Sequence, residues 1–349
     1  MKQIGLYDET DALARLSQLG DKLEWLESVM DWEIFLPLLD KTKPDRTKEG
    51  KGGRPPLSNL IMFKILLLAE LYHVANNQME FQINDRLSWK RFLGMTLSDK
   101  APDATSIWLF REMLTNSGVY DKLFELFNQK LEKLGVITHK GTIVDASFVD
   151  VPRQRNTREQ NKVIKEHRMP EGWDLPENAH MLAQKDLEAE WAKKNDELHF
   201  GYKDHVCVDA ESKIITDWRV TGASVHDSLI WSCFIDSRVK AFWADSAYMS
   251  AEALEWFAIH HPEIVLHINS KGYRNHPLTE DQKAENRENS RIRARIEHVF
   301  GHMTNSMGGM TLRCIGSFRA ECAIVMKNLV YNISRYATLC RLKHTPQMS

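Results

Sequence analysis

Three acidic residues stand in sequence contexts where a carboxylate needs an explanation. Asp145 lies in the middle of "TIVDASF", an otherwise apolar strand, where a charge has to be paired, exposed or bound to a metal. Asp245 follows the apolar segment "AFWA", at the carboxyl edge where open α/β sheets bind ligands. Glu297 is the single acid in "NSRIRARIEHVFGHM", which also holds three arginines.

Three carboxylates brought together would repel one another without a cation between them. Hard oxygen ligands suit hard divalent cations, and two Mg²⁺ ions about 3.5 to 4 Å apart stabilise both the attacking and the leaving oxygen of an in-line phosphoryl displacement. Each acid also has an ordinary explanation. Asp145 could be an edge-strand charge, Asp245 a turn former or helix cap, and Glu297 the i,i+4 partner of Arg293. Residue types and spacing leave both interpretations open.

The helix expected at about 279–306 would place Glu297 at the margin of its packed face. Apolar residues at helical spacing form one stripe that we expect to pack on a sheet: Ile292, Ile296, Val299 and Met303. A basic stripe on one flank would stay free for phosphates, and it consists of Arg291, Arg295, His298 and His302. Arg293 and Glu297 lie on the other flank, so we expect Glu297 to lean over the sheet edge towards the two aspartates, away from bulk water.

The order of expected elements indicates an all-α N-terminal domain followed by an α/β domain. Residues 1–135 have helical periodicity, with helices expected at about 57–74, 76–93, 103–116 and 119–134. Over 136–349 the order β-β-β-α-β-α-β-α-α predicts a mixed five-stranded sheet flanked by helices, and "DSLIWSCFI" is the first of those helices. A charged segment at about 152–198 indicates an insertion, partly helical near 180–195.

Two N-terminal features are compatible with DNA recognition. Short helices joined by a tight turn, as in "FQINDRLSWKRFLG" followed by "DATSIWLFREML", fit a helix-turn-helix, with an all-helical packing domain as the alternative. The basic loop "KGGRPP" could enter a minor groove with Arg54, with a flexible linker as the alternative.

Composition narrows the class of protein. Of 349 residues, 43% are apolar, which is typical of folded chains, and the five cysteines show no C-x-x-C pair, which favours reduced thiols. The net charge is only -2, yet from Lys271 onwards 13 Lys and Arg face 6 Asp and Glu. This basic end predicts a local polyanion-binding surface. The longest apolar run is too short for a bilayer span and the start lacks secretory-signal features, so we expect a cytoplasmic protein.

Four strings in the chain resemble those of one known family. "VDAS", "GYKDHVCVD", "ADSAY" and "RIRARIEHVFGHM", in this order, are similar to the DDE transposases of bacterial insertion sequences, in particular the insertion-sequence-5 family. "RPPLSNLIMFKILLLAELY" and "DATSIWLFREML" resemble the helical N-terminal region of that family. The resemblance implies a ribonuclease H-like catalytic domain after a helical DNA-binding or dimerisation region.

The resemblance also implies roles for individual residues. Asp145, Asp245 and Glu297 would be the catalytic, metal-binding acids, and Arg293 matches the arginine of the family's helix signature, where it would orient Glu297 or touch a phosphate. The signature's tyrosine and lysine are replaced by Ser290 and Thr304. Other side chains therefore have to bind the DNA, and the candidates are Arg54, Arg291, Arg293, Arg295 and His298.

The implied activity is Mg²⁺-dependent cleavage at the element's ends and strand transfer into target DNA. Two Mg²⁺ ions, replaceable by Mn²⁺, would be the cofactors. Double-stranded DNA, namely terminal inverted repeats and target, would be the partner, with a homodimer or higher assembly on it and no membrane. The protein would then associate with the nucleoid when it acts.

Three rival interpretations remain open. The protein could be a catalytically inactive helix-turn-helix regulator, or a plain DNA nuclease with the same site. His298 and His302, spaced i,i+4, could bind zinc, although "HVFGH" lacks the glutamate of a metalloprotease helix. Three other acids are interpreted as structural, on grounds of strand parity, turn position and helix capping: Asp150, Asp209 and Asp227.

Overall fold

The computed structural model of the chain describes residues 8–42, 57–194, 196–235, 238–245, 250–270, 272 and 277–344. Its contacts divide the chain into two compact units. One comprises Met1–Phe127 with Leu329–Ser349, and the other comprises Asn128–Asn328. The sequence had suggested one boundary near residue 135, with all later residues in the catalytic domain.

The first unit is built from helices around an aromatic and aliphatic core. Phe35 packs against Phe63 and Phe127, with ring centroids 5.1 and 6.1 Å apart. The end of α13 (Ser317–His344) and the part of α8 (Tyr120–Lys133) up to Phe127 belong to this unit. Its other helices are α1 (Asp8–Gln18), α2 (Lys22–Val29), η1 (Trp32–Phe35), α3 (Leu36–Thr42), α4 (Asn59–Leu71), α5 (Asn76–Asp85), α6 (Leu87–Phe92) and α7 (Ala104–Ser117).

The expected helix at 76–93 is in fact two helices. Arg86 has an extended backbone, with φ -101° and ψ 108°, and separates α5 from α6. Residues 93–103 then separate α6 from α7, and the buried Lys90 ammonium donates hydrogen bonds to the carbonyl oxygens of Thr96, Leu97 and Asp99 in this loop. The tight turn was expected between "FQINDRLSWKRFLG" and "DATSIWLFREML". It lies instead between α5 and α6, inside the first of these segments. Recognition of DNA by these helices stays a prediction.

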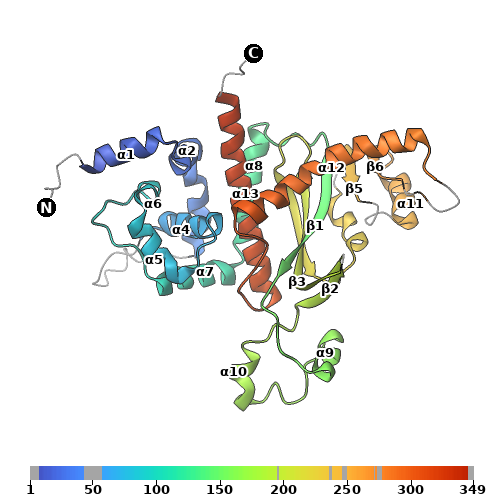
Figure 1. The fold of residues 1–349 in the computed structure, drawn as a ribbon, viewed down its shortest axis with the longest axis horizontal. Coiled ribbons are helices and arrows are strands. Elements are labelled where there is room, and N and C mark those ends of the chain that lie inside the picture. The colour runs from blue at the N-terminus through green and yellow to red at the C-terminus, as the bar shows by residue number, and fades with distance from the viewer. Residues whose placement is uncertain are drawn as a thin grey trace. The chain divides into compact units, whose positions relative to one another are not determined.

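The second unit contains a mixed sheet of six strands (Figure 1). The order is β2-β3-β1-β5-β6, and β4 also pairs with β3. Strand β1 is antiparallel to β3 and parallel to β5. The bounds are β1 (Thr142–Asp150), β2 (Glu190–Lys194), β3 (Glu197–Asp209), β4 (Ile215–Gly222), β5 (Ala241–Ala244) and β6 (Val265–Ile268). The sixth strand, β2, comes from the segment that we had taken for an insertion.

The helices of this unit depart from expectation at two places. Residues 190–194 form strand β2 instead of helix, and "DSLIWSCFI" forms two short 3₁₀ turns, η4 (Asp227–Leu229) and η5 (Trp231–Phe234). The others are α9 (Arg158–Lys165), η3 (Pro176–Asn178), α10 (Ala179–Leu182), α11 (Ala251–His260), α12 (Glu280–Ser306) and the start of α13. Helices α9 and α10 lie beyond the end of the sheet (Figure 1).

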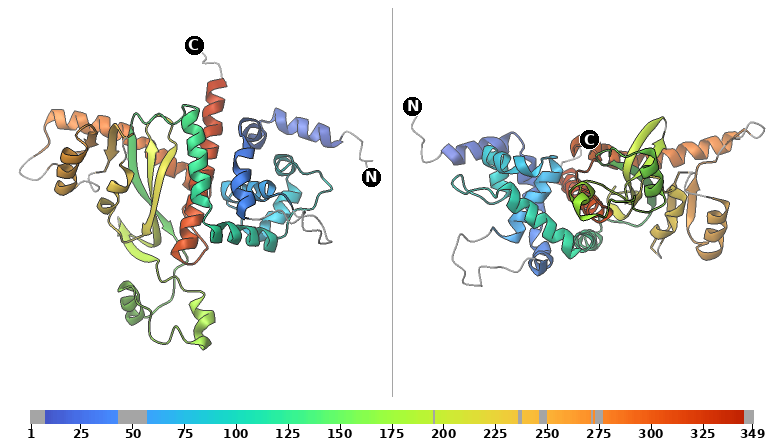
Figure 2. Two further views of the ribbon diagram at one scale, coloured as in Figure 1. Left: turned by 180° about the vertical axis from the view of Figure 1, so that it is seen from behind. Right: turned by 90° about the horizontal axis from the view of Figure 1, so that it is seen from below.

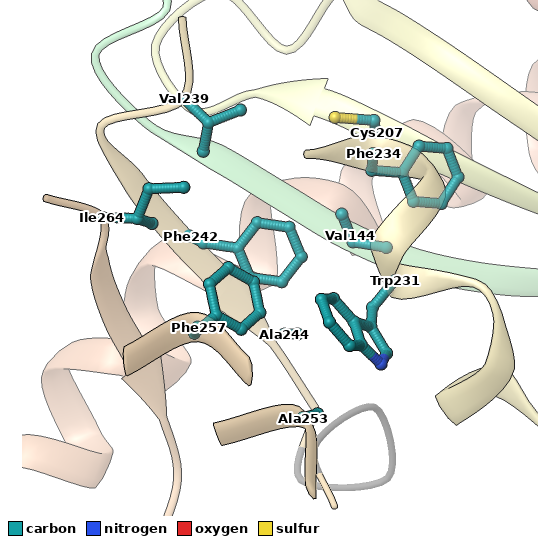
Figure 3. Packing of buried hydrophobic residues seen from close by; sticks show 10 residues of the cluster. All are labelled: Val144, Cys207, Trp231, Phe234, Val239, Phe242, Ala244, Ala253, Phe257 and Ile264. Carbon is teal, nitrogen blue, oxygen red and sulfur yellow. The ribbon is translucent and has the colours of Figure 1, made fainter. Parts of the chain in front are cut away.

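One face of the sheet is covered by an apolar cluster (Figure 3). Val144 of β1 and Phe242 and Ala244 of β5 pack there with Trp231 of η5 and Phe257 of α11. Because successive side chains of a strand point to opposite faces, the odd-numbered neighbours of these residues on β1 and β5 point to the other face.

Helix α12 covers that other face, in contact with β1, β5 and β6 (Figures 1 and 2). A capping box at Thr279 and Gln282 fixes its N-terminus. Ile296, Val299 and Met303 are fully buried, while Ile292 is partly exposed. The predicted apolar stripe is therefore confirmed, and it holds the helix against the sheet.

No single helix within the described ranges is long and apolar enough to cross a membrane. Only α4 and α5 taken together meet the criteria of length and composition, and they are bent by 102° relative to each other.

Candidate active site

Asp145 and Asp245 occupy matching positions along two parallel chain segments. The register pairs Ile143 with Trp243 as the last partners of β1 and β5; two residues later, Asp145 lies within β1 and Asp245 directly follows the end of β5. Partners in a parallel pair point to the same face, so both carboxylates point to the face covered by α12. The two aspartates therefore lie on one face where β1 and β5 separate, and Asp145 senses the charge of Asp245. Their role as catalytic acids stays a prediction.

The pKa of Asp145 records this environment. Burial raises the pKa of its carboxyl, and the nearby charge of Asp245 raises it further. The Ala146 N–H, which donates a 2.8 Å hydrogen bond to Asp145 Oδ1, lowers this pKa, as do the cations of Arg293 and Lys194. A carboxyl whose pKa is raised by burial and by a neighbouring carboxylate, as that of Asp145 is, favours a cation between the two acids.

Arg293 joins helix α12 to this pair of acids. Its Nη2 lies 3.9 Å from Asp245 Oδ2, and its side chain is largely buried, whereas that of Asp245 is half exposed. The Arg293 Nε is buried and has no hydrogen-bond partner among the described residues. The expected contact between Arg293 and Glu297 is not found in the described part of the chain. In this structure Arg293 orients Asp245 instead.

Glu297 lies one helical turn beyond Arg293 on the same flank of α12. Its side chain is exposed, and within the described ranges it makes no hydrogen bond or ion pair. The expectation that it would be sheltered from bulk water was therefore wrong, because the buried stripe of Ile296, Val299 and Met303 covers another side of α12 and leaves the flank of Glu297 open. A role for Glu297 as third acid stays a prediction.

The basic flank of α12 is partly engaged within the chain. The Arg295 guanidinium donates a hydrogen bond to the carbonyl oxygen of Ala210, and Lys213 donates one to His298 Nδ1 at 2.7 Å. Arg291 is exposed and lies 3.7 Å from Glu288. The stripe is thus not wholly free for phosphates as expected, because its middle packs on the β3–β4 turn. Arg54 lies outside the described residues.

The carboxylates of Asp145, Asp245 and Glu297 are suitable ligands for a hard divalent cation, but they do not form a complete metal site in this structure. Asp145 and Asp245 offer oxygen ligands at one edge of the sheet, which is what Mg²⁺ or Mn²⁺ requires. Across the described residues, however, no group of three or more His, Cys, Asp or Glu side chains lies at metal-binding spacing. The same holds for a zinc site at His298 and His302. The two aspartates could supply part of the ligands of a metal site, and a third ligand would have to move closer to complete it.

The three acids interpreted as structural have partners within the chain. Asp209 accepts hydrogen bonds from Thr138, His139 and Ser212 and so fixes the β3–β4 turn. Asp150 lies 3.2 Å from His199 Nδ1. Asp227 was expected to cap a helix, but the N-cap residue of η4 is His226. Asp227 instead accepts a 2.9 Å hydrogen bond from Lys203.

Sequence reasoning missed a buried polar pair on the face of the sheet to which Asp145 points. Asp204 of β3 and Asn328 of α13 are fully buried, and Asn328 Nδ2 donates to Asp204 Oδ1 at 3.2 Å. Asp204 Oδ2 and Asn328 Oδ1 have no partner within the described ranges. Burial raises the pKa of Asp204 to about 7. The signal for Asp204 was present, since it interrupts the apolar strand "GYKDHVCVD", but nothing in the sequence indicated its partner.

Comparison with known families agrees with this geometry. Residues 137–333 match the family model described as "Transposase DDE domain", and residues 11–113 match the one described as "Transposase domain (DUF772)". The first match spans more than half of the chain, so the chain belongs to the family of transposases with a DDE domain. It is therefore a DNA transposase, and its family implies dependence on a divalent metal. The narrower insertion-sequence-5 assignment stays a prediction.

The chain also resembles one solved structure, the cryo-EM structure of the piggyBac transposase synaptic complex with hairpin DNA. Sequence identity is 10% and the TM-score is 0.46, with 94% of this chain and 76% of that chain covered.

Proposed function

We propose that this transposase cuts and joins DNA at a site formed by Asp145, Asp245 and Glu297. The observation that supports it is the matched position of the two aspartates where β1 and β5 separate, beside an α12 that reaches Asp245 through Arg293. Glu297 is one turn from Arg293 on a helix whose buried stripe holds it in place. A change of side-chain rotamer would then turn its carboxylate towards the aspartates.

The three acids would hold two Mg²⁺ ions, with Mn²⁺ as a substitute. When bound, such ions activate water and neutralise charge on a transferring phosphoryl group. Asp145 and Asp245 supply fixed oxygen ligands, and the burial around Asp145 limits competition from bulk water. Arg293 fixes the orientation of Asp245. Arg291 and His298, both exposed on α12, would hold flanking DNA phosphates.

The substrate would be double-stranded DNA at the terminal inverted repeats of an insertion sequence. Hydrolysis of the phosphodiester at the element's end frees a 3′-hydroxyl, which attacks a phosphodiester of the target. Two ends require two sites, so a homodimer or larger assembly would form on DNA. The protein would work in the cytoplasm, on the nucleoid, without a membrane partner. The N-terminal helices, with Arg54 in the basic loop, would recognise the ends.

The test is incubation of the full chain with a duplex carrying the element's end, a supercoiled plasmid as target, and either Mg²⁺ or EDTA. Nicks at the end together with joined end-plasmid products would support the proposal. Nicks without joining would identify a plain nuclease, and binding without nicks would identify an inactive regulator.

A further inference from the structure

The segment between β1 and β2, residues 152–189, forms a small lobe beyond the end of the sheet (Figures 1 and 2). Charge is divided unevenly along it. Residues 152–168 contain six Lys or Arg and two Glu, whereas residues 169–189 contain one Lys and five Asp or Glu. The lobe therefore has a basic half, which includes α9, and an acidic half, which includes α10. Such a separation favours binding of a polyanion by the basic half alone.

Helix α9 presents its cations on one exposed face. Arg158, Lys162 and Lys165 are spaced i, i+4 and i+7, so they lie on the same side of the helix, and all three are exposed. Val163 and Ile164 lie on the opposite side and are partly buried. In the described part of the chain none of the three cationic side chains forms a hydrogen bond or an ion pair. The basic face of α9, defined by these three residues, is thus open to an anion.

Hydrogen bonds at the base of the lobe fasten it to the sheet. The buried Asp186 carboxylate accepts hydrogen bonds from the Tyr202 hydroxyl of β3 at 2.9 Å and from the Gly316 N–H at 3.0 Å. Gln154 Nε2 donates to the Asp186 carbonyl oxygen at 2.9 Å, which joins the two ends of the lobe. Cations carried on such a support bind a regular anionic surface with a smaller loss of entropy than cations on a free loop.

The lobe continues from β1 on the side to which the carboxyl ends of β1 and β5 point. Strand β1 runs on from Asp145 to Asp150, which at about 3.3 Å per residue is roughly 17 Å. B-form DNA rises about 3.4 Å per base pair along each strand. A duplex with its scissile phosphate at Asp145 would therefore meet α9 about five or more base pairs from the cut. Contacts there add affinity and take no part in the chemistry.

We propose that the basic face of α9 binds the phosphate backbone of duplex DNA away from the cut. For the place of the DNA this inference rests on the proposed function, which puts the scissile phosphate beside Asp145. Duplex DNA carries one negative charge about every 1.7 Å along its axis, so three cations on one helix face meet several phosphates. Arg and Lys donate charge-assisted hydrogen bonds to phosphate oxygens. The acidic half of the lobe repels the same backbone, which favours approach of the duplex from the side of α9.

The test measures binding and cutting on the same full-chain variants. The triple variant Arg158→Gln, Lys162→Gln, Lys165→Gln is titrated against a fluorescein-labelled duplex of about 40 base pairs in EDTA, over a range of KCl concentrations. We expect binding to weaken by roughly 10- to 100-fold and the slope of log K against log salt to fall by about two to three, because up to three phosphate contacts are lost. Glutamine has nearly the helix propensity of Lys and Arg, so α9 should still form. In Mg²⁺ and at saturating protein, the triple variant should cut at close to the normal rate.

Two control variants distinguish a DNA contact from a general effect of charge. Exchange of Arg for Lys and of Lys for Arg at the three positions of α9 keeps the charge and should keep the affinity. The second control removes three exposed lysines that are ion-paired within the chain, and so lowers the net charge by the same amount. It combines Lys140→Gln, Lys193→Gln and Lys283→Gln. Its binding should stay close to that of the unmodified chain.

Three outcomes would overturn the proposal: unchanged binding by the α9 triple variant, an equal loss in either control, or loss of cutting by the triple variant at saturating protein. A loss of affinity confined to the triple variant would support it, even where the unmodified chain binds DNA and does not cut it in Mg²⁺. Absence of cutting by the unmodified chain would count against the proposed function alone.

Discussion

Arg293 of α12 lies 3.9 Å from Asp245, the residue that directly follows β5. Three chain segments far apart in sequence therefore meet at one edge of the sheet, since Asp145 senses the charges of both residues. Arg293 thus connects α12 to the end of β5, while the buried residues Ile296, Val299 and Met303 hold the helix against the sheet.

Replacing Arg293 tests this link. Arg293→Ala should slow DNA cleavage by roughly 10- to 100-fold and raise the Mg²⁺ concentration needed for half-maximal rate, because side chains that orient metal ligands have effects of this size. Arg293→Lys should recover only part of the loss, since one ammonium cannot replace a planar guanidinium. The measurement is single-turnover cleavage across a metal titration. Arg287→Ala, which removes an exposed arginine of the same helix, is the matched control, and an unchanged metal requirement in Arg293→Ala would contradict the orienting role.

Replacing the three acids by their amides should separate catalysis from binding. Asp145→Asn, Asp245→Asn and Glu297→Gln should each reduce cleavage by about a thousandfold or more, since each removes a ligand of ions that contribute several kcal/mol. Binding to duplex DNA in Ca²⁺ should persist. Asp217→Asn, which changes a half-exposed acid on β4 that pairs with Arg219, serves as the control. Cleavage at the normal rate by one variant would remove that residue from the proposed site.

The two candidate aspartates could be found from the sequence, but the strand register that aligns them with each other could not. An acid inside an apolar strand and another at the end of one are visible in "TIVDASF" and "AFWADSAY". Their convergence depends on the register of β1 and β5, which rests on two residue pairs. Register between strands about 100 residues apart is set by tertiary packing, which periodicity does not report.

Helical periodicity likewise fixed which residues share a flank of α12, but not their contacts. It grouped Arg293 with Glu297 and predicted the buried stripe. Which of the two faces Asp245 depends on the position of the helix along its own axis, set by the packing of Ile296 and Val299 on the sheet.

Strand β2 was missed because charge dominates its segment. The clue in the sequence was Asp196, because aspartate is common in the tight turns of β-hairpins. In the structure Asp196 lies between Lys194 and Glu197 with φ 65°, and such turns often require a positive φ.

Arg295 and Arg291 should have separable roles, although both were predicted to bind DNA. Arg295→Ala removes a hydrogen bond to the Ala210 carbonyl and should lower the free energy of unfolding by about 1 to 2 kcal/mol. Arg291→Ala should leave unfolding unchanged and reduce the salt slope of DNA binding by about one. Urea denaturation and fluorescence anisotropy on the two variants measure these effects. A normal stability of Arg295→Ala, with DNA binding lost, would reverse the assignment.

The buried pair of Asp204 and Asn328 should make stability depend on pH. Burial raises the pKa of Asp204 to about 7, from an ordinary value near 3.9 in the unfolded chain. Between these values the folded chain binds a proton that the unfolded chain has lost. The stability that this proton confers is therefore fully present below about pH 3.9 and is lost at up to roughly 1.4 kcal/mol per unit as pH rises towards about 7, where the loss levels off. Protonated Asp204 Oδ2 can also donate a hydrogen bond, which its ionised form cannot.

His205, the next residue, works in the opposite direction. Burial lowers the pKa of its imidazole, so below about pH 6.5 the unfolded chain takes up a proton that the folded chain refuses, and stability falls as pH falls. The two slopes offset each other between about pH 4 and 6.5, and above about pH 7 neither group contributes a slope, so a variant that lacks the Asp204 carboxyl is needed to isolate its effect.

Asp204→Asn isolates this contribution, because an amide keeps the shape and cannot ionise. Melting temperatures of the variant and the unmodified chain should be compared between pH 5 and pH 8, with Asp217→Asn, at a half-exposed position, as the control. The variant's melting temperature should rise relative to the unmodified chain as pH increases, and should exceed it at pH 8, where the unmodified chain carries a buried carboxylate. A difference that stays constant over this range would show that Asp204 does not titrate there, and that the two unpartnered oxygens of the pair are satisfied in another way.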